Sequence, residues 1–99
     1  MNERQFCVLV VDDSFDVLEI IQLSLEAKTD WHILVTSSGR EAVVLAAREQ
    51  PNVILLDVQM PKINGIETLK KLRACSKTKN IPILFFDRCP CCYIVGINR

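Results

Sequence analysis

Apolar runs alternate with helical patterns along this chain of 99 residues. Short, continuous apolar segments at 6–11, 31–36, 53–56 and 81–86 predict strands that are buried on both faces. Between these segments, apolar residues recur at helical spacing after Ser14, after Ser38 and from Ile66 to about Ala74. Strands that alternate with helices predict an α/β fold, with an open, doubly wound parallel sheet.

Local signals mark where the second helix begins and ends. Ser38 is followed three residues later by Glu41, which is the pattern of a capping box at a helix N-terminus. The triplet Gln50-Pro51-Asn52 predicts the break between this helix and the third strand.

Length and charge limit the class of protein. Ninety-nine residues, about half of them apolar, favour one compact domain that spans 1–99. Twelve basic and twelve acidic side chains cancel, so we expect neither nucleic acid nor a membrane surface as a direct partner. No apolar run has the length of a signal peptide core or of a membrane span, and we expect a cytoplasmic protein.

Cysteine usage agrees with that compartment. The five cysteines are an odd number, and Cys7 and Cys75 lie far apart in otherwise ordinary segments. This pattern is a poor fit to a secreted disulfide framework, so we expect reduced thiols.

Three carboxylates follow two of the predicted strands. Asp12 and Asp13 come directly after the first strand, and Asp57 ends the buried third strand. Functional groups of open α/β sheets gather at the carboxyl ends of the strands, so neighbouring first and third strands would bring these acids together. Such a cluster repels itself and is costly without a cation, and hard oxygen ligands suit Mg²⁺.

Three motifs now carry a family resemblance. VLVVDDS, LLDVQMP and the ING of PKING, with a strand-helix repeat between the first two, resemble the receiver domain of two-component response regulators. The order of elements agrees over residues 5–86. The resemblance implies a flavodoxin-like fold with strand order 2-1-3-4-5.

The resemblance also implies roles for individual residues. Asp57 matches the aspartate that accepts a phosphoryl group from a histidine of a sensor kinase or phosphotransfer protein. Asp12, Asp13, Asp57 and the backbone carbonyl of Gln59 match the ligands of Mg²⁺. Such a chain is a phosphoacceptor in signal transduction and not an enzyme beyond self-phosphorylation and self-dephosphorylation. Structural roles are implied for the loop residues Met60, Pro61, Asn64 and Gly65.

The sequence departs from the family after the fourth strand, so residues 1–86 are family-like and 87–99 are atypical. Asp87 stands where the family has a Thr or Ser that binds the phosphoryl group, and no lysine occurs after Lys79. We therefore expect an incomplete receiver in which the fourth strand has an exposed apolar edge and the isolated chain self-associates. Residues 93–97 either return antiparallel as a hairpin or add to the sheet of another chain.

Other interpretations stay open at this point. The chain is alternatively a degenerate, phosphorylation-independent interaction module, or an inactive truncated receiver. Cys89, Cys91 and Cys92 raise the weaker hypothesis of a thiol-based metal or redox site, although their spacing lacks paired C-x-x-C motifs. A single acid after a strand is usually a turn former or a helix cap.

Two further groups of residues have ordinary interpretations. We expect His32, on an edge strand, to be a partly exposed side chain without a catalytic role. We expect Lys62, Lys70, Lys71 and Arg73 to form the solvated face of the third helix region, with Glu67 and Lys71 spaced as an i,i+4 pair.

Overall fold

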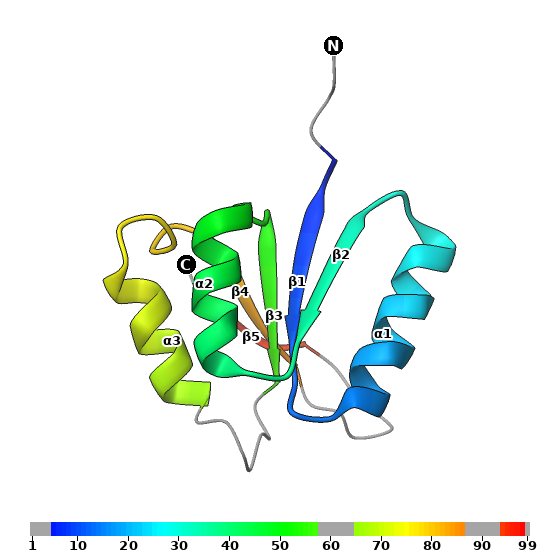
Figure 1. The fold of residues 1–99 in the computed structure, drawn as a ribbon, viewed down its shortest axis with the longest axis horizontal. Helices are drawn as coiled ribbons and strands as arrows, with labels where there is room; N and C mark the ends of the chain where they lie inside the picture. Colours follow the sequence, from blue (N-terminus) through cyan, green and yellow to red (C-terminus); the bar gives the residue numbers. More distant parts are fainter. Residues whose placement is uncertain (1–4, 58–64, 87–93, 99) are drawn as a thin grey trace.

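The structure is a computed structural model that describes residues 5–57, 65–86 and 94–98. Five strands and three helices lie in these segments (Figure 1). In chain order they are β1 (Cys7–Val11), α1 (Phe15–Lys28), β2 (His32–Thr36), α2 (Gly39–Glu49), β3 (Val53–Asp57), α3 (Gly65–Ala74), β4 (Ile83–Phe86) and β5 (Ile94–Asn98). None of the helices in these segments is long and apolar enough to cross a membrane.

The strands form one sheet in the order β2-β1-β3-β4-β5. The first four strands are parallel, which confirms the predicted doubly wound α/β fold with β1 and β3 as neighbours. β5 runs antiparallel to β4, so of the two arrangements expected for the C-terminal strand the structure contains the hairpin. The expectation of an exposed edge on β4 is therefore wrong, because β5 supplies the hydrogen-bonding partner of that edge.

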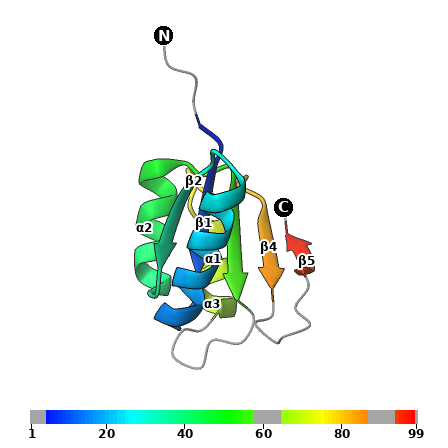
Figure 2. The same ribbon diagram turned by 90° about the vertical axis from the view of Figure 1, so that its right-hand side faces the viewer.

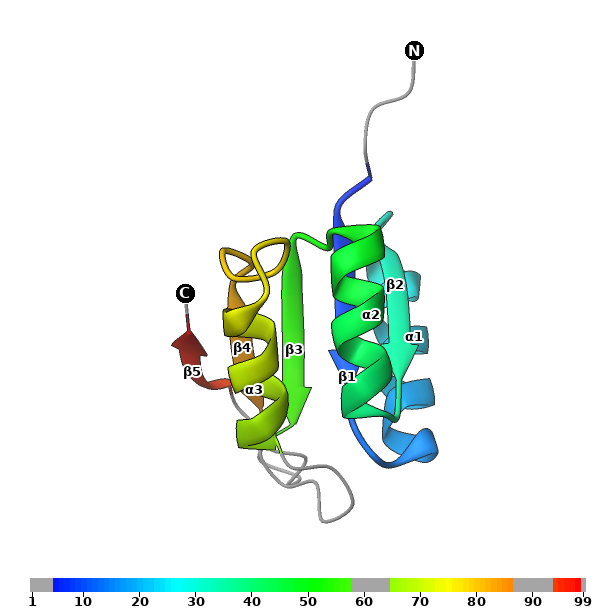
Figure 3. The same cartoon turned by 60° about the vertical axis from the view of Figure 1, so that its left-hand side comes forward.

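Helices cover the two faces of the sheet unequally. α2 and α3 lie together on one face (Figure 3), over a core of nine buried residues that includes Leu9, Ile54 and Leu72. Of the described helices, α1 is the one that lies on the other face (Figure 2), over a smaller buried cluster. That cluster consists of Val8, Val10, Leu18 and Ile33.

Two serines begin the first two helices as the sequence predicts. The Oγ atom of Ser14 accepts a hydrogen bond from the backbone N–H of Val17, and the Oγ atom of Ser38 accepts one from Glu41. The expected capping box of Ser38 and Glu41 takes a relayed form. The N–H of Ser38 donates to the hydroxyl of Thr36, which in turn donates to the carboxylate of Glu41.

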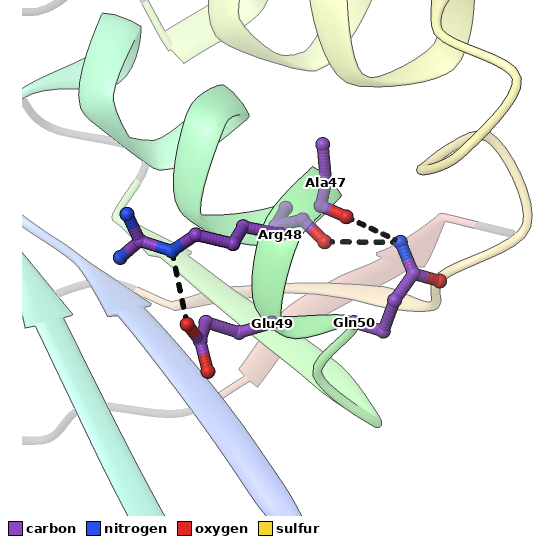
Figure 4. A network of polar contacts seen from close by, with 5 residues as sticks. Ala47, Arg48, Glu49 and Gln50 are labelled. Atoms are coloured by element: carbon purple, nitrogen blue, oxygen red, sulfur yellow. Dashed lines mark hydrogen bonds and ion pairs between the residues drawn. The ribbon is translucent and has the colours of Figure 1, made fainter.

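Gln50 ends α2 in the left-handed conformation, with φ 51° and ψ 59°. Its backbone N–H and its side-chain amide both donate to the carbonyl of Ala46, and the amide also donates to the carbonyl of Ala47 (Figure 4). The same amide donates to the carbonyl of Lys77 at 2.9 Å. One side chain therefore caps α2 and joins it to the loop between α3 and β4. On the outside of α2, Arg48 and Glu49 form an exposed ion pair at 3.0 Å (Figure 4).

Two sequence expectations need correction near α3. Arg73 is half-buried, and its guanidinium donates to the backbone carbonyls of Thr78 and Lys79, so it does not belong to a solvated face. β4 begins at Ile83 and not at Ile81, because the N–H of Ile81 closes a turn onto Thr78. Lys70 and Lys71 are exposed as expected, and so is His32 on the edge strand β2.

Candidate functional site

The three predicted carboxylates occupy neighbouring positions at one edge of the sheet. β1 ends at Val11, which pairs with Leu56 of β3, so Asp12 and Asp57 each stand one residue further along adjacent parallel strands. The N–H of Asp12 donates to the carbonyl of Thr36 at 3.2 Å, which continues the ladder between β1 and β2 by one residue. Backbone pairing therefore fixes where these two side chains begin.

The structure brings Asp12, Asp13 and Asp57 together. One carboxylate oxygen from each lies within 4.8 Å of the others. Asp12 and Asp57 are fully buried, and Asp13 is half-buried at the mouth of the cluster. The spacing of acids in the sequence, together with the strand order, correctly predicted this convergence.

Local hydrogen bonds orient Asp12. Its Oδ1 atom accepts a hydrogen bond from the backbone N–H of Ser14 at 2.9 Å, the residue that caps α1. The same carboxylate thus closes the turn between β1 and the helix. Oδ2 of Asp12 and Oδ2 of Asp57 are buried and accept no hydrogen bond within the described part of the chain.

Thr36 is a site-adjacent residue that the sequence analysis missed. It is buried at the end of β2, and its carbonyl holds the N–H of Asp12 while its hydroxyl organises the start of α2. Its contacts with Ser38 and Glu41 could have been predicted, because Thr36 is a hydroxyl residue two positions before a Ser-x-x-Glu pattern. The contact with Asp12 could be found only from the strand order.

The donor set fits a hard divalent cation. Three carboxylates that approach this closely, two of them buried, repel one another unless a positive charge lies between them. Mg²⁺ binds through one or two carboxylates and keeps several waters, which suits a cluster with one half-buried member at its opening. The geometry can hold such an ion and place Asp57 beside it.

Several predicted site residues lie outside the described residues. These are Gln59, Met60, Pro61 and Asn64 of the loop before α3, and Asp87, Cys89, Cys91 and Cys92 after β4. Gly65 is described, and it is the first residue of α3. Cys7 and Cys75, the other two cysteines, form no disulfide with each other.

Comparison with known proteins decides the family. The pattern of the response regulator receiver domain matches residues 8–87, which is most of the chain. This chain belongs to the response regulator receiver domain family. Its doubly wound sheet is that of a receiver domain in a two-component system.

Curated relatives of this receiver domain are longer proteins. The alkaline phosphatase synthesis transcriptional regulatory protein PhoP of Bacillus subtilis is 41% identical over 73 residues, which are 74% of this chain and 29% of that protein. A protein-glutamate methylesterase/protein-glutamine glutaminase of Trichodesmium erythraeum is 38% identical over 85 residues, which are 84% of this chain and 23% of that protein. The chain thus spans about a quarter of the length of these relatives, and the methylesterase name describes that whole protein.

Solved structures agree on the fold. The chemotaxis protein CheY4 of Vibrio cholerae matches with a TM-score of 0.75 and 33% identity, over 83% of this receiver domain and 68% of that chain. The response regulator domain of Thermotoga maritima CheB matches with a TM-score of 0.65 and 36% identity, over 76% of this chain and 57% of that chain.

Proposed function

We propose that this receiver domain accepts a phosphoryl group on Asp57 from a phosphorylated histidine of a sensor kinase or phosphotransfer protein. Asp12, Asp13, Asp57 and the backbone carbonyl of Gln59 would hold Mg²⁺ during the transfer. The observation that carries this proposal is the approach of three carboxylate oxygens to within 4.8 Å at the carboxyl edge of a parallel sheet.

The chemistry asks little of the protein beyond position and charge. A carboxylate oxygen of Asp57 forms a bond to phosphorus while the bond from phosphorus to the histidine nitrogen breaks, and the electron pair of that bond stays on the imidazole. Bound Mg²⁺ supplies positive charge that offsets the phosphoryl oxygens. The carbonyl of Thr36 and the N–H of Ser14 keep Asp12 in place next to the acceptor.

The buried position of Asp57 makes it a selective acceptor. Asp16 and Asp30 are exposed acids that do not belong to the cluster of three carboxylates. A cation at the cluster would lower the repulsion between Asp57 and an incoming phosphoryl group only at this edge. The chain would therefore act as a signalling phosphoacceptor and not as a hydrolase or synthase.

A second candidate function is a receiver that binds a partner without being phosphorylated. The sequence favours it at one place, because Asp87 stands where the family has a hydroxyl residue and no lysine follows Lys79. An acid beside the phosphoryl group would repel it. Both functions use the same fold but differ in whether Asp57 reacts.

Intact mass spectrometry with a small phosphoramidate donor separates the two functions. We expect the chain to gain the mass of one phosphoryl group in the presence of Mg²⁺, and Asp57→Asn to gain none. Asp30→Asn is the matched control, because Asp30 is an exposed acid outside the cluster, and this variant should react like the parent chain. A folded parent chain that gains no mass would support the second function.

A further inference from the structure

Asp12 is held at the cluster from two sides. Its Oδ1 atom accepts a hydrogen bond from the N–H of Ser14, which is a local contact within the turn. Its own N–H donates to the carbonyl of Thr36 at 3.2 Å, and this bond extends the ladder between β1 and β2 past the end of β1. The point from which the buried carboxylate of Asp12 reaches the cluster therefore depends on where the Thr36 carbonyl lies.

The strand β2 by itself holds that carbonyl weakly. In the described sheet β2 is an edge strand (Figure 1), so it pairs with β1 on one side only. Thr36 is the last residue of β2, and its carbonyl belongs to the peptide that leads into the connection to α2. Strand ends with few neighbours open readily, so the other contacts of Thr36 decide how firmly its carbonyl is held.

The hydroxyl of Thr36 provides those contacts. Its Oγ1 atom accepts a hydrogen bond from the backbone N–H of Ser38 at 3.1 Å, which closes a turn over Ser37. A hydroxyl has one hydrogen to donate, and the carboxylate of Glu41 at 2.5 Å is a better acceptor than the carbonyl of Ser38 at 3.4 Å. The hydroxyl thus ties the end of β2 to the first turn of α2.

Glu41 is itself fixed by the start of that helix. Its N–H donates to the Oγ atom of the N-cap residue Ser38 at 3.2 Å. A carboxylate in the first turn is also favoured by the helix dipole. A continuous chain of hydrogen bonds therefore runs from the start of α2 through Thr36 to the backbone of Asp12.

We propose that Thr36 is a positioning residue of the metal site, because its hydroxyl, held by Ser38 and Glu41, fixes the carbonyl that holds Asp12. The inference rests on the Mg²⁺ binding of the proposed function. Mg²⁺ demands nearly ideal ligand geometry, and residues that orient a metal ligand commonly contribute about tenfold or more to metal affinity. Thr36 acts through Asp12 and supplies no ligand of its own.

Glu41 takes part through its hydrogen bond and not through its charge. Glu41→Gln keeps an acceptor oxygen for the hydroxyl of Thr36 but removes the charge, whereas Glu41→Ala removes both. We expect the glutamine variant to bind Mg²⁺ nearly as the parent chain does, and the alanine variant to bind it several-fold more weakly. Equal losses in the two variants would contradict this role, because they would show that the charge of Glu41 attracts the cation.

Amide hydrogen exchange of the metal-free chain tests the positioning directly. Thr36→Val loses the hydroxyl, and we expect it to speed exchange of the Asp12 N–H by about tenfold or more relative to amides in the middle of β1. Ser37 and Glu41 line a surface hollow of about 450 Å³, so water can reach the groups that lose a partner and the variant should fold. Thr36→Ser restores the hydroxyl and should restore the protection of this amide.

Thr29 offers a matched control, because its hydroxyl makes contacts of the same kind before the other end of β2. It accepts a hydrogen bond from the N–H of Trp31 and donates one to the carbonyl of Leu25. Thr29→Val should leave exchange of the Asp12 amide and binding of Mg²⁺ unchanged. Thr36→Val should weaken Mg²⁺ binding by about tenfold in isothermal titration calorimetry.

The two measurements separate this inference from the proposed function. A parent chain that binds no Mg²⁺ would contradict the proposed function, and exchange of the Asp12 amide would still decide whether Thr36 positions Asp12. Unchanged exchange in Thr36→Val would overturn the inference, and so would unchanged Mg²⁺ binding by that variant when the parent chain binds. A serine variant as impaired as the valine variant, or an equal effect of Thr29→Val, would also overturn it.

Discussion

Backbone pairing of β3 with its two neighbouring strands places Asp57 at the edge of the sheet. Asp57 is the last residue of β3, and its strand is held between β1 and β4. The acid could be predicted from the sequence because a buried apolar strand that ends in a carboxylate is a visible local pattern. The role of Thr36 could not be predicted, because its hydrogen bond with Asp12 joins residues that only the strand order brings together.

At the same scale, Asp13 should contribute strongly to binding of Mg²⁺. Asp13→Asn removes one of three charges at the opening of the cluster, and we expect the affinity for Mg²⁺ to fall by roughly tenfold or more. Isothermal titration calorimetry measures the change. Asp16→Asn, an exposed acid in the first turn of α1, should bind Mg²⁺ as the parent chain does. Equal affinities in all three proteins would show that the cluster is not the metal site.

Cys75 offers a residue-scale prediction that depends on pH. Two hydrogen bonds lower the pKa of the Cys75 thiol. The bond with the backbone of Lys77 has the larger effect, and the bond with the side chain of Thr78 has the smaller one. Because the thiolate is the reactive form, alkylation of Cys75 by iodoacetamide should accelerate at lower pH than alkylation of an ordinary cysteine. Peptide mass mapping follows each cysteine separately.

The unfolded chain provides the control for that measurement. In denaturant the hydrogen bonds to Cys75 are lost, so its alkylation profile should move back to higher pH. Identical profiles in the folded and unfolded chain would contradict the assigned effect of these hydrogen bonds.

At the scale of elements, the caps show which signals the sequence carries. Ser14 and Ser38 were predicted as helix starts and are confirmed, because capping uses residues three positions apart. The end of α2 was predicted from Gln50-Pro51-Asn52, but the bond from Gln50 to Lys77 crosses 27 residues and was invisible. The anchoring of Arg73 to the carbonyls of Thr78 and Lys79 was missed because it depends on how the chain folds back after α3.

Gln50 allows the cap and the backbone strain to be separated. Gln50→Ala removes the side-chain hydrogen bonds but keeps a Cβ atom at positive φ, so we expect a loss of about 1–2 kcal/mol in the free energy of unfolding. Gln50→Gly loses the same bonds but relieves the left-handed conformation, which should recover about 1 kcal/mol. Urea unfolding measures both variants. If the glycine variant were less stable than the alanine variant, the left-handed backbone at Gln50 would not be a source of strain.

At the scale of the whole molecule, the periodicity of the sequence predicted the parallel sheet and its helices. The direction of β5 was left open because a short strand can pair with its own sheet or with another chain. The packing of two described helices on one face and one on the other could not be read from periodicity, because it depends on how the strands are ordered in the sheet. We propose that 1–99 forms a single receiver-like domain with an atypical segment at 87–99.

The Mg²⁺ dependence of phosphorylation tests the central claim most directly. The parent chain is incubated with phosphoramidate in the presence of Mg²⁺ or of a chelator, and the intact mass is recorded over time. We predict addition of one phosphoryl group, mapped to Asp57, only when Mg²⁺ is present. A folded chain that stays unmodified with Mg²⁺, or that is modified equally at other acids, would contradict the account of this site.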